Sequence, residues 1–95
     1  MYLIALHLTG PDNRRPDPDE IVALIQEHAE PVDQVEHVRV RVQPGRIDIA
    51  FFLLAREPRF ARQAAQTICH RVLDHTVWLT QWRLTDDSTQ PQQSF

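Results

Sequence analysis

Hydrophobic positions along this chain recur with a period of two in some stretches and of about 3.6 in others. Residues 2–8 alternate with period two, which predicts a first strand. A run dense in turn formers follows, and Asp17, Pro18 and Glu20 then supply an N-cap, a first-turn proline and a capping-box acid. These signals predict a helix that runs to about Ala29. Ile21, Leu24, Ile25 and His28 follow the i, i+3, i+4, i+7 spacing of one helix face.

The period returns to two from residue 34, where valines alternate with charged residues as far as Val42. The following residues, 43–46, place proline and then glycine at the centre of a turn, the chemistry of a type II turn, so we expect a hairpin. A strand rich in apolar residues should follow. One face of that strand would carry Ile47, Ile49, Phe51 and Leu53.

A second helix is predicted from Pro58, because alanines and larger apolar residues form a narrow stripe as far as Val72. Residues 76–84 are rich in strand formers and predict a last strand. Trp78 and Trp82 would share one of its faces, although Val77 and Leu79 could equally point inward. The polar segment 86–95 has no period and is predicted to be a disordered tail.

The predicted order is therefore strand, helix, strand, strand, helix, strand. With right-handed crossovers, this order predicts an α+β domain of the ferredoxin-like βαββαβ kind over residues 1–85. We expect a four-stranded antiparallel sheet with two helices on one face. The length of 95 residues allows one hydrophobic core.

Composition narrows the class of protein. The chain is 42% hydrophobic and 24% charged, as in ordinary globular proteins, and no apolar run approaches the length of a membrane span. All ten basic residues are arginine, and the net charge of −3 disfavours nucleic acid as a partner. The N-terminus lacks the basic start of a signal peptide, and Cys69 is the single cysteine, so we expect a cytoplasmic protein.

The run Leu-Thr-Gly-Pro-Asp, which includes Gly10 and Asp12, resembles the loop after the first strand of an ACT domain. The hairpin segment 32–54 resembles the same family in pattern. This resemblance implies a regulatory domain of the same topology, usually dimeric, in which the loop approaches a bound amino acid. The segment 13–18 departs from the family pattern and lacks its second glycine.

The five histidines and the cysteine show no spacing typical of a metal site, so neither a metal nor another cofactor is expected. Nucleotide-binding and hydrolase motifs are also absent from the sequence. Cys69 is predicted to be buried beside the alanine stripe and inert.

Strict alternation sends a mixed set of charged and aromatic residues to the sheet face away from the helices. We predict that this face binds a ligand or forms an interface, together with the glycine and aspartate of the first loop. The candidate residues are His7, His37, Arg39, Arg41, Asp48, Phe52, Gly10 and Asp12.

Two interpretations of this surface remain open. Arginine could hold an anionic ligand while histidine carries a proton. Alternatively, Arg39 and Arg41 keep a strand soluble and block edge pairing, with Asp48 in a cross-strand ion pair. Phe52 favours an interface over full exposure.

Three functions fit these features. The favoured hypothesis is a small non-catalytic regulatory or accessory module, acting as a homodimer through its open sheet face and binding a small anionic or aromatic ligand or a partner protein. The alternative is a small dimeric α+β barrel enzyme with His7 or His37 as general base. A third is an accessory protein that accepts a partner strand at residues 38–42.

Overall fold

The computed structural model describes residues 1–11 and 15–85. Asp12 and the predicted tail 86–95 lie outside the described residues. The elements are β1 (Tyr2–Thr9), α1 (Pro18–His28), the 3₁₀ turn η1 (Pro31–Asp33), β2 (Val35–Gln43), β3 (Arg46–Leu53), α2 (Pro58–His75), the 3₁₀ turn η2 (Val77–Leu79) and β4 (Arg83–Thr85).

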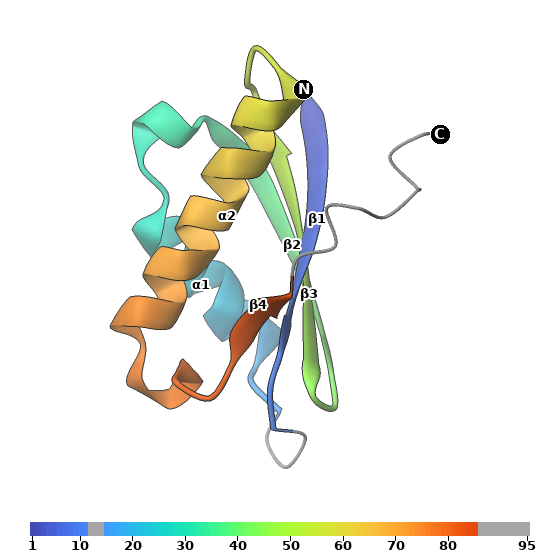
Figure 1. Cartoon of the computed structure of the whole chain (residues 1–95), viewed down its shortest axis with the longest axis vertical. Helices are drawn as coiled ribbons and strands as arrows, with labels where there is room; N and C mark the ends of the chain where they lie inside the picture. The colour runs from blue at the N-terminus through green and yellow to red at the C-terminus, as the bar shows by residue number, and fades with distance from the viewer. Residues whose placement is uncertain (12–14, 86–95) are drawn as a thin grey trace.

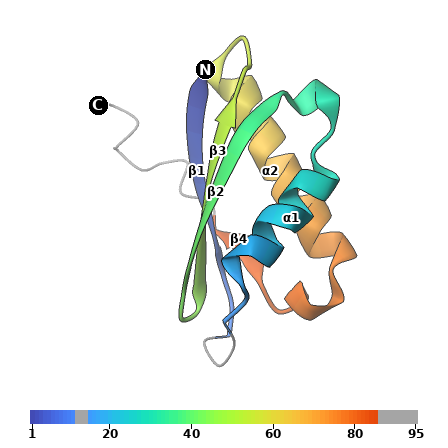
Figure 2. The ribbon, with the colours of Figure 1, turned by 180° about the vertical axis from the view of Figure 1, so that it is seen from behind.

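The four strands form one antiparallel sheet in the order β2-β3-β1-β4. Both helices lie on the same side of this sheet, as Figure 1 and the reverse view in Figure 2 show. The prediction of an α+β chain with a four-stranded antiparallel sheet and two helices is confirmed. None of the helices within residues 1–11 and 15–85 is long and apolar enough to cross a membrane.

The core lies between the sheet and the helices. Alternation along β1 and β3 directs one set of apolar side chains to the helices, as the period of two predicts. The alanine stripe of α2 faces the same core, where small side chains allow close approach of the helix to the sheet. The members with no exposed surface are Ile25, Ile47, Phe51, Leu53, Ala61, Ala65, Ile68 and Leu79.

The predicted starts of the helices and the hairpin turn are confirmed. The Asp17 carboxylate caps α1 by accepting a hydrogen bond of 2.9 Å from the backbone N–H of Asp19. The hairpin turn places Gly45 at φ 72°, a left-handed conformation that glycine adopts without steric penalty. This turn sets the register of β2 against β3 and therefore decides which side chains share a face.

The last strand is present, but the predicted range of residues 76–84 is wrong because the strand begins only at Arg83. After α2 the chain makes the turn η2, in which the N–H of Leu79 donates to the carbonyl of Thr76 at 3.0 Å. Only Arg83–Thr85 pairs with β1. The reason is burial: the turn brings both Leu79 and Trp82 into the core, at a spacing of three that a strand cannot place on one face.

Because of this turn, Trp78 and Trp82 do not lie on one face, as the predicted strand would have placed them. Trp82 is buried in the core, whereas Trp78 is half-buried beside Leu24 of α1. Val77 is left 83% exposed. Tertiary burial has therefore overridden the strand propensity of the segment.

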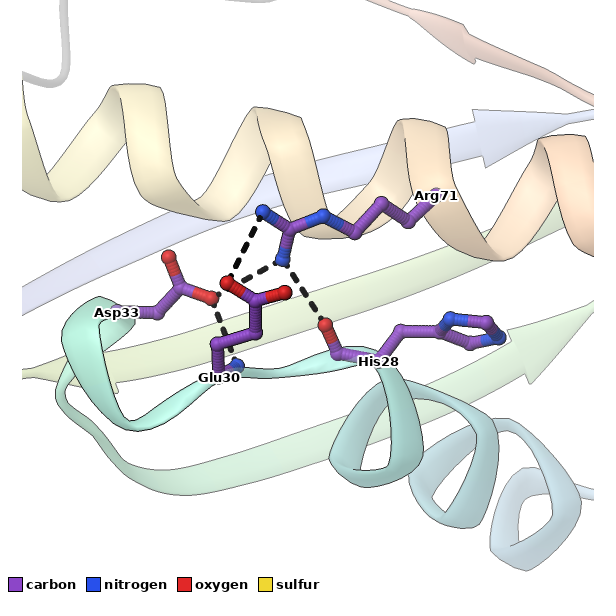
Figure 3. A network of polar contacts seen from close by, with 4 residues as sticks. All are labelled: His28, Glu30, Asp33 and Arg71. Atoms are coloured by element: carbon purple, nitrogen blue, oxygen red, sulfur yellow. Dashed lines mark hydrogen bonds and ion pairs between the residues drawn. The ribbon is translucent and has the colours of Figure 1, made fainter.

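Arg71 of α2 joins three elements (Figure 3). Its Nη1 donates to the backbone carbonyl of His28 at the end of α1, at 3.0 Å, and to the Asp33 carboxylate in η1, at 3.2 Å. Glu30 lies 3.8 Å from Nη2, and its own N–H donates to Asp33. This network ties the C-terminal end of α1 to α2, since the last carbonyls of a helix lack partners within it.

Candidate functional site

The sheet face opposite the helices, called the open face below, carries four rows of side chains set by the strand register. The rows run across β2, β3 and β1, and each lies two residues further along the strands than the last. From the hairpin end they are Gln43, Arg46 and Thr9; then Arg41, Asp48 and His7; then Arg39, Ala50 and Ala5; then His37, Phe52 and Leu3.

An open hollow of about 590 Å³ lies over the first three rows of this face. Its low floor is formed by Ala5 and Ala50, which face each other across β1 and β3. Longer side chains border that floor on two sides: Arg39 lies beside Ala50 in the same row, and Arg41, Asp48 and His7 form the next row toward the hairpin. The other open-face residues that line the hollow are His7, Arg39, Arg41, Arg46 and Asp48.

The hollow carries an excess of positive charge. Three guanidinium groups face one carboxylate, and that carboxylate is already paired, with 2.7 Å between Arg46 Nε and Asp48 Oδ1. Arg39 and Arg41 form no hydrogen bond or ion pair with any described residue. The expected cross-strand ion pair of Asp48 is therefore replaced by a pair with Arg46 within β3. Two cationic side chains remain available at the edge of the hollow.

His7 is buried, with 8% of its surface exposed, although it lies on the open face. Its register neighbours are Asp48 on β3 and Thr85 on β4. Thr85 in turn lies 3.0 Å from Thr9, hydroxyl to hydroxyl. The imidazole therefore forms the inner wall of the hollow next to the paired carboxylate.

His37 and Phe52 lie together but outside the hollow. They are register partners on β2 and β3, and their ring centroids are 5.7 Å apart. His37 is exposed and does not line the hollow that contains His7. The enzyme hypothesis allowed either histidine as base, and only His7 has a hollow beside it.

Gly10 is half-buried and lies against the side chain of Trp82. Its N–H donates to the carbonyl of Gly45 at 3.1 Å, and a Cβ atom at this position would overlap the indole of Trp82. Packing of the tryptophan therefore explains the need for glycine here. Gly10 does not line the hollow, and Asp12, its predicted companion, lies outside the described residues. Their part in binding stays a prediction.

Three open-face residues of the hollow were not among the sequence-based candidates: Ala5, Ala50 and Arg46. Arg46 was assigned to the turn alone. Its position two residues before Asp48 on the same strand is the signal that places both on one face. The alanines carry no functional group, and only the register shows that they lie side by side.

Cys69 is buried in the core at 1% exposure, as predicted. Burial raises the pKa of its thiol from 9.0 to about 12, because an apolar environment disfavours the thiolate. It is therefore no nucleophile at neutral pH. Over residues 1–11 and 15–85, no three histidine, cysteine, aspartate or glutamate side chains are grouped so as to hold a metal ion.

The residue types that line the hollow are ones that can bind an anion. Guanidinium groups bind carboxylate or phosphate oxygens in a bidentate way, and small floor residues leave room for the bound group.

Comparison with known proteins does not identify a family. The chain matches no protein-family model, no curated protein and no solved structure.

Proposed function

We propose that this protein is a non-catalytic module that binds a small anionic ligand on the open face of its sheet. The observation that supports this function is the position of Arg39 and Arg41, which border a hollow floored by alanine and have no partner in the described part of the chain. Arginines that only keep an edge strand soluble have no need of a hollow beside them.

Charge supports the same interpretation. The whole chain carries a net charge of −3, yet the hollow gathers three arginines and one carboxylate. An acidic chain that concentrates positive charge at one site attracts anions to that site rather than to its surface in general. The site is too small and the chain too acidic for a nucleic-acid backbone.

The proposed fold type is ferredoxin-like. The order β2-β3-β1-β4 supports it, because β3 separates β1 from β2 and β1 separates β3 from β4. Each β-α-β unit therefore has one strand of the other unit between its own two strands. We retain the resemblance to ACT domains as a proposal about the regulatory role of such a module, with the ligand on the sheet face rather than at Gly10.

We propose as well that two copies associate through the apolar end of the open face. Leu3 is 59% exposed there, beside half-buried Phe52. Grouped apolar side chains left in water usually mark an interface. Sedimentation velocity should give a dimer at micromolar concentration that Leu3→Glu dissociates and Val77→Glu, on an exposed turn elsewhere, does not. A monomeric wild-type protein would refute this association.

Titration with inorganic phosphate, followed by amide NMR at constant ionic strength, tests the anion-binding function. We expect saturable shifts at β2 and β3 around Arg39, Arg41 and Ala50. Arg39→Gln and Arg41→Gln should each weaken binding by roughly tenfold, as expected when one charge-assisted hydrogen-bonding group is lost.

Arg59→Gln is the matched control, because Arg59 lies on α2 and pairs with Glu57 on an exposed surface. This variant should bind phosphate like the wild type. Equal weakening in all three variants, or no saturable shift in the wild type, would contradict a specific site.

A further inference from the structure

The open face changes character along its strands. The two rows nearest the hairpin carry arginine, aspartate and histidine, the third carries Arg39 beside two alanines, and the fourth is His37, Phe52 and Leu3. The cationic end and the apolar end therefore adjoin each other across the alanine floor. A surface graded in this way is complementary to a molecule that is itself anionic at one end and apolar at the other.

We infer that the ligand of the proposed anion site is a small aryl acid, in which one carboxylate or phosphate group is attached to a flat apolar ring. This inference rests on the proposed function, because it assigns the anionic group to Arg39 and Arg41. It adds the second half of the ligand and its orientation, with the ring lying over Ala5 and Ala50 and directed toward Phe52.

The dimensions of the sheet support this orientation. Successive rows on one face of a strand are about 6.8 Å apart, and neighbouring strands are about 4.8 Å apart. The distance from the Arg39 row to the Phe52 row is therefore close to the length of a phenyl ring with a short acidic side chain. A simple oxyanion would leave the alanine floor unoccupied.

The floor itself favours a flat group. Ala5 and Ala50 are register partners, so their methyl groups present one low apolar strip beside Arg39. Any larger residue at either position would fill the space above it. At the far end of the strip, Phe52 is half-buried, and its ring centroid lies 5.7 Å from that of His37. Aromatic rings pack well against one another in such offset or tilted arrangements.

The test compares five probes with the full-length protein by amide NMR and calorimetry. These are acetate, inorganic phosphate, phenylacetate, phenyl phosphate and the neutral 2-phenylethanol. We expect each aryl acid to bind roughly tenfold more tightly than its simple anion, the gain expected from an apolar group in an apolar site. The neutral alcohol should bind more weakly than either aryl acid. Comparison of the two aryl acids then identifies the preferred anionic group.

Two variants separate the ring site from the anion site. Ala50→Leu should remove the advantage of phenylacetate over acetate while leaving acetate binding within about twofold of the wild type. Phe52→Ala should act in the same direction without filling the floor. Phe60→Ala is the control, because Phe60 is an exposed aromatic residue on α2. It should change nothing.

The outcomes distinguish this inference from the proposed function. Binding of phosphate and acetate at Arg39 and Arg41 with no gain from a phenyl group would overturn the aryl-acid ligand and leave the anion site standing. No binding of any anion would overturn both. Binding of 2-phenylethanol as tight as that of phenylacetate would overturn the bipartite ligand. An aryl-acid advantage that Ala50→Leu and Phe52→Ala both leave intact would overturn the proposed position of the ring.

Discussion

Arg46 and Asp48 form an ion pair along β3, with 2.7 Å between Nε and Oδ1. Asp48 is thus paired within its own strand and forms no ion pair with Arg41, its register partner on β2. The hollow consequently holds one neutralised arginine and two available ones. The positive charge of the hollow therefore depends both on which residues line it and on which of them are paired.

Removing the carboxylate should strengthen anion binding. Asp48→Asn is expected to raise the affinity for inorganic phosphate roughly threefold, because a negative charge about 7 Å from the bound anion is lost in a solvated setting. Stability should change by less than about 1 kcal/mol, since this pair is partly exposed. Titration and urea unfolding measure the two effects. Glu57→Gln is the control, because Glu57 precedes α2 and forms an exposed pair of the same sequence spacing with Arg59. Weaker phosphate binding in Asp48→Asn would mean that Asp48 holds Arg46 in a conformation that binding requires.

Arg71 should matter for stability and not for the hollow. Arg71→Met removes hydrogen bonds to the His28 carbonyl and to Asp33, whose side chain is only 9% exposed. We expect a loss of about 2 kcal/mol in the free energy of unfolding, because charged hydrogen bonds are broken and their partners are left partly buried. Chemical denaturation measures this, with Arg59→Met expected to stay within about 0.5 kcal/mol of the wild type. Equal stability of the two variants would show that the network in Figure 3 contributes nothing.

The contact between Gly10 and Trp82 predicts a strong coupling. Gly10→Ala should destabilise the protein by about 2 kcal/mol or more, because the added methyl group overlaps a buried indole. Gly45→Ala, at positive φ in the open turn, should lose about 1 kcal/mol from backbone strain alone. In Trp82→Leu, which is itself destabilised, the further effect of Gly10→Ala should fall to a few tenths of a kcal/mol. Additive losses in this double-mutant cycle would rule out the steric account.

Because the Cys69 thiol is buried, we expect the protein to lose stability at high pH. Burial raises the pKa of Cys69 to about 12, so the native protein holds its proton while the unfolded chain releases it above a pKa of about 9. The unfolded state then binds fewer protons, and the free energy of unfolding falls as the pH rises from about 9 to about 12. Below pH 9 this contribution is fully present. Urea unfolding of the wild type and of Cys69→Ala across this range isolates it, because the variant should lack this part of the slope. Rapid alkylation of the native thiol at pH 8 would contradict the burial.

Much of the fold could be predicted because its strongest signals are local. The N-cap Asp17, the turn glycine Gly45 and the alternation of β3 each act over a few residues, and each has its expected effect. The range predicted for the last strand was wrong because the burial of Leu79 and Trp82 is a tertiary effect, which strand propensity does not include.

The hollow was predictable only in part for a related reason. Arg39, Arg41 and Asp48 carry charges that single them out, and alternation places them on one face. Ala5 and Ala50 lie 45 residues apart in the sequence and have no functional groups. Their meeting depends on the register of β1 against β3, which no local pattern determines.

The hydroxyl of Thr76 offers a stabilising change at the turn that the sequence did not reveal. Its Oγ1 is buried without a hydrogen-bond partner among the described residues, at the junction of α2 and η2. A buried hydroxyl without a partner is destabilising, and valine has the same shape without that polar atom. The backbone there is extended, at φ −122° and ψ 107°, which suits a β-branched residue. Thr76→Val should therefore raise the free energy of unfolding by about 1 kcal/mol, whereas Thr76→Ser, which keeps the hydroxyl and loses the methyl group, should lower it by a similar amount. Thermal and urea unfolding of both variants measure the difference, and a destabilised Thr76→Val would mean that the hydroxyl has a bound water or another partner.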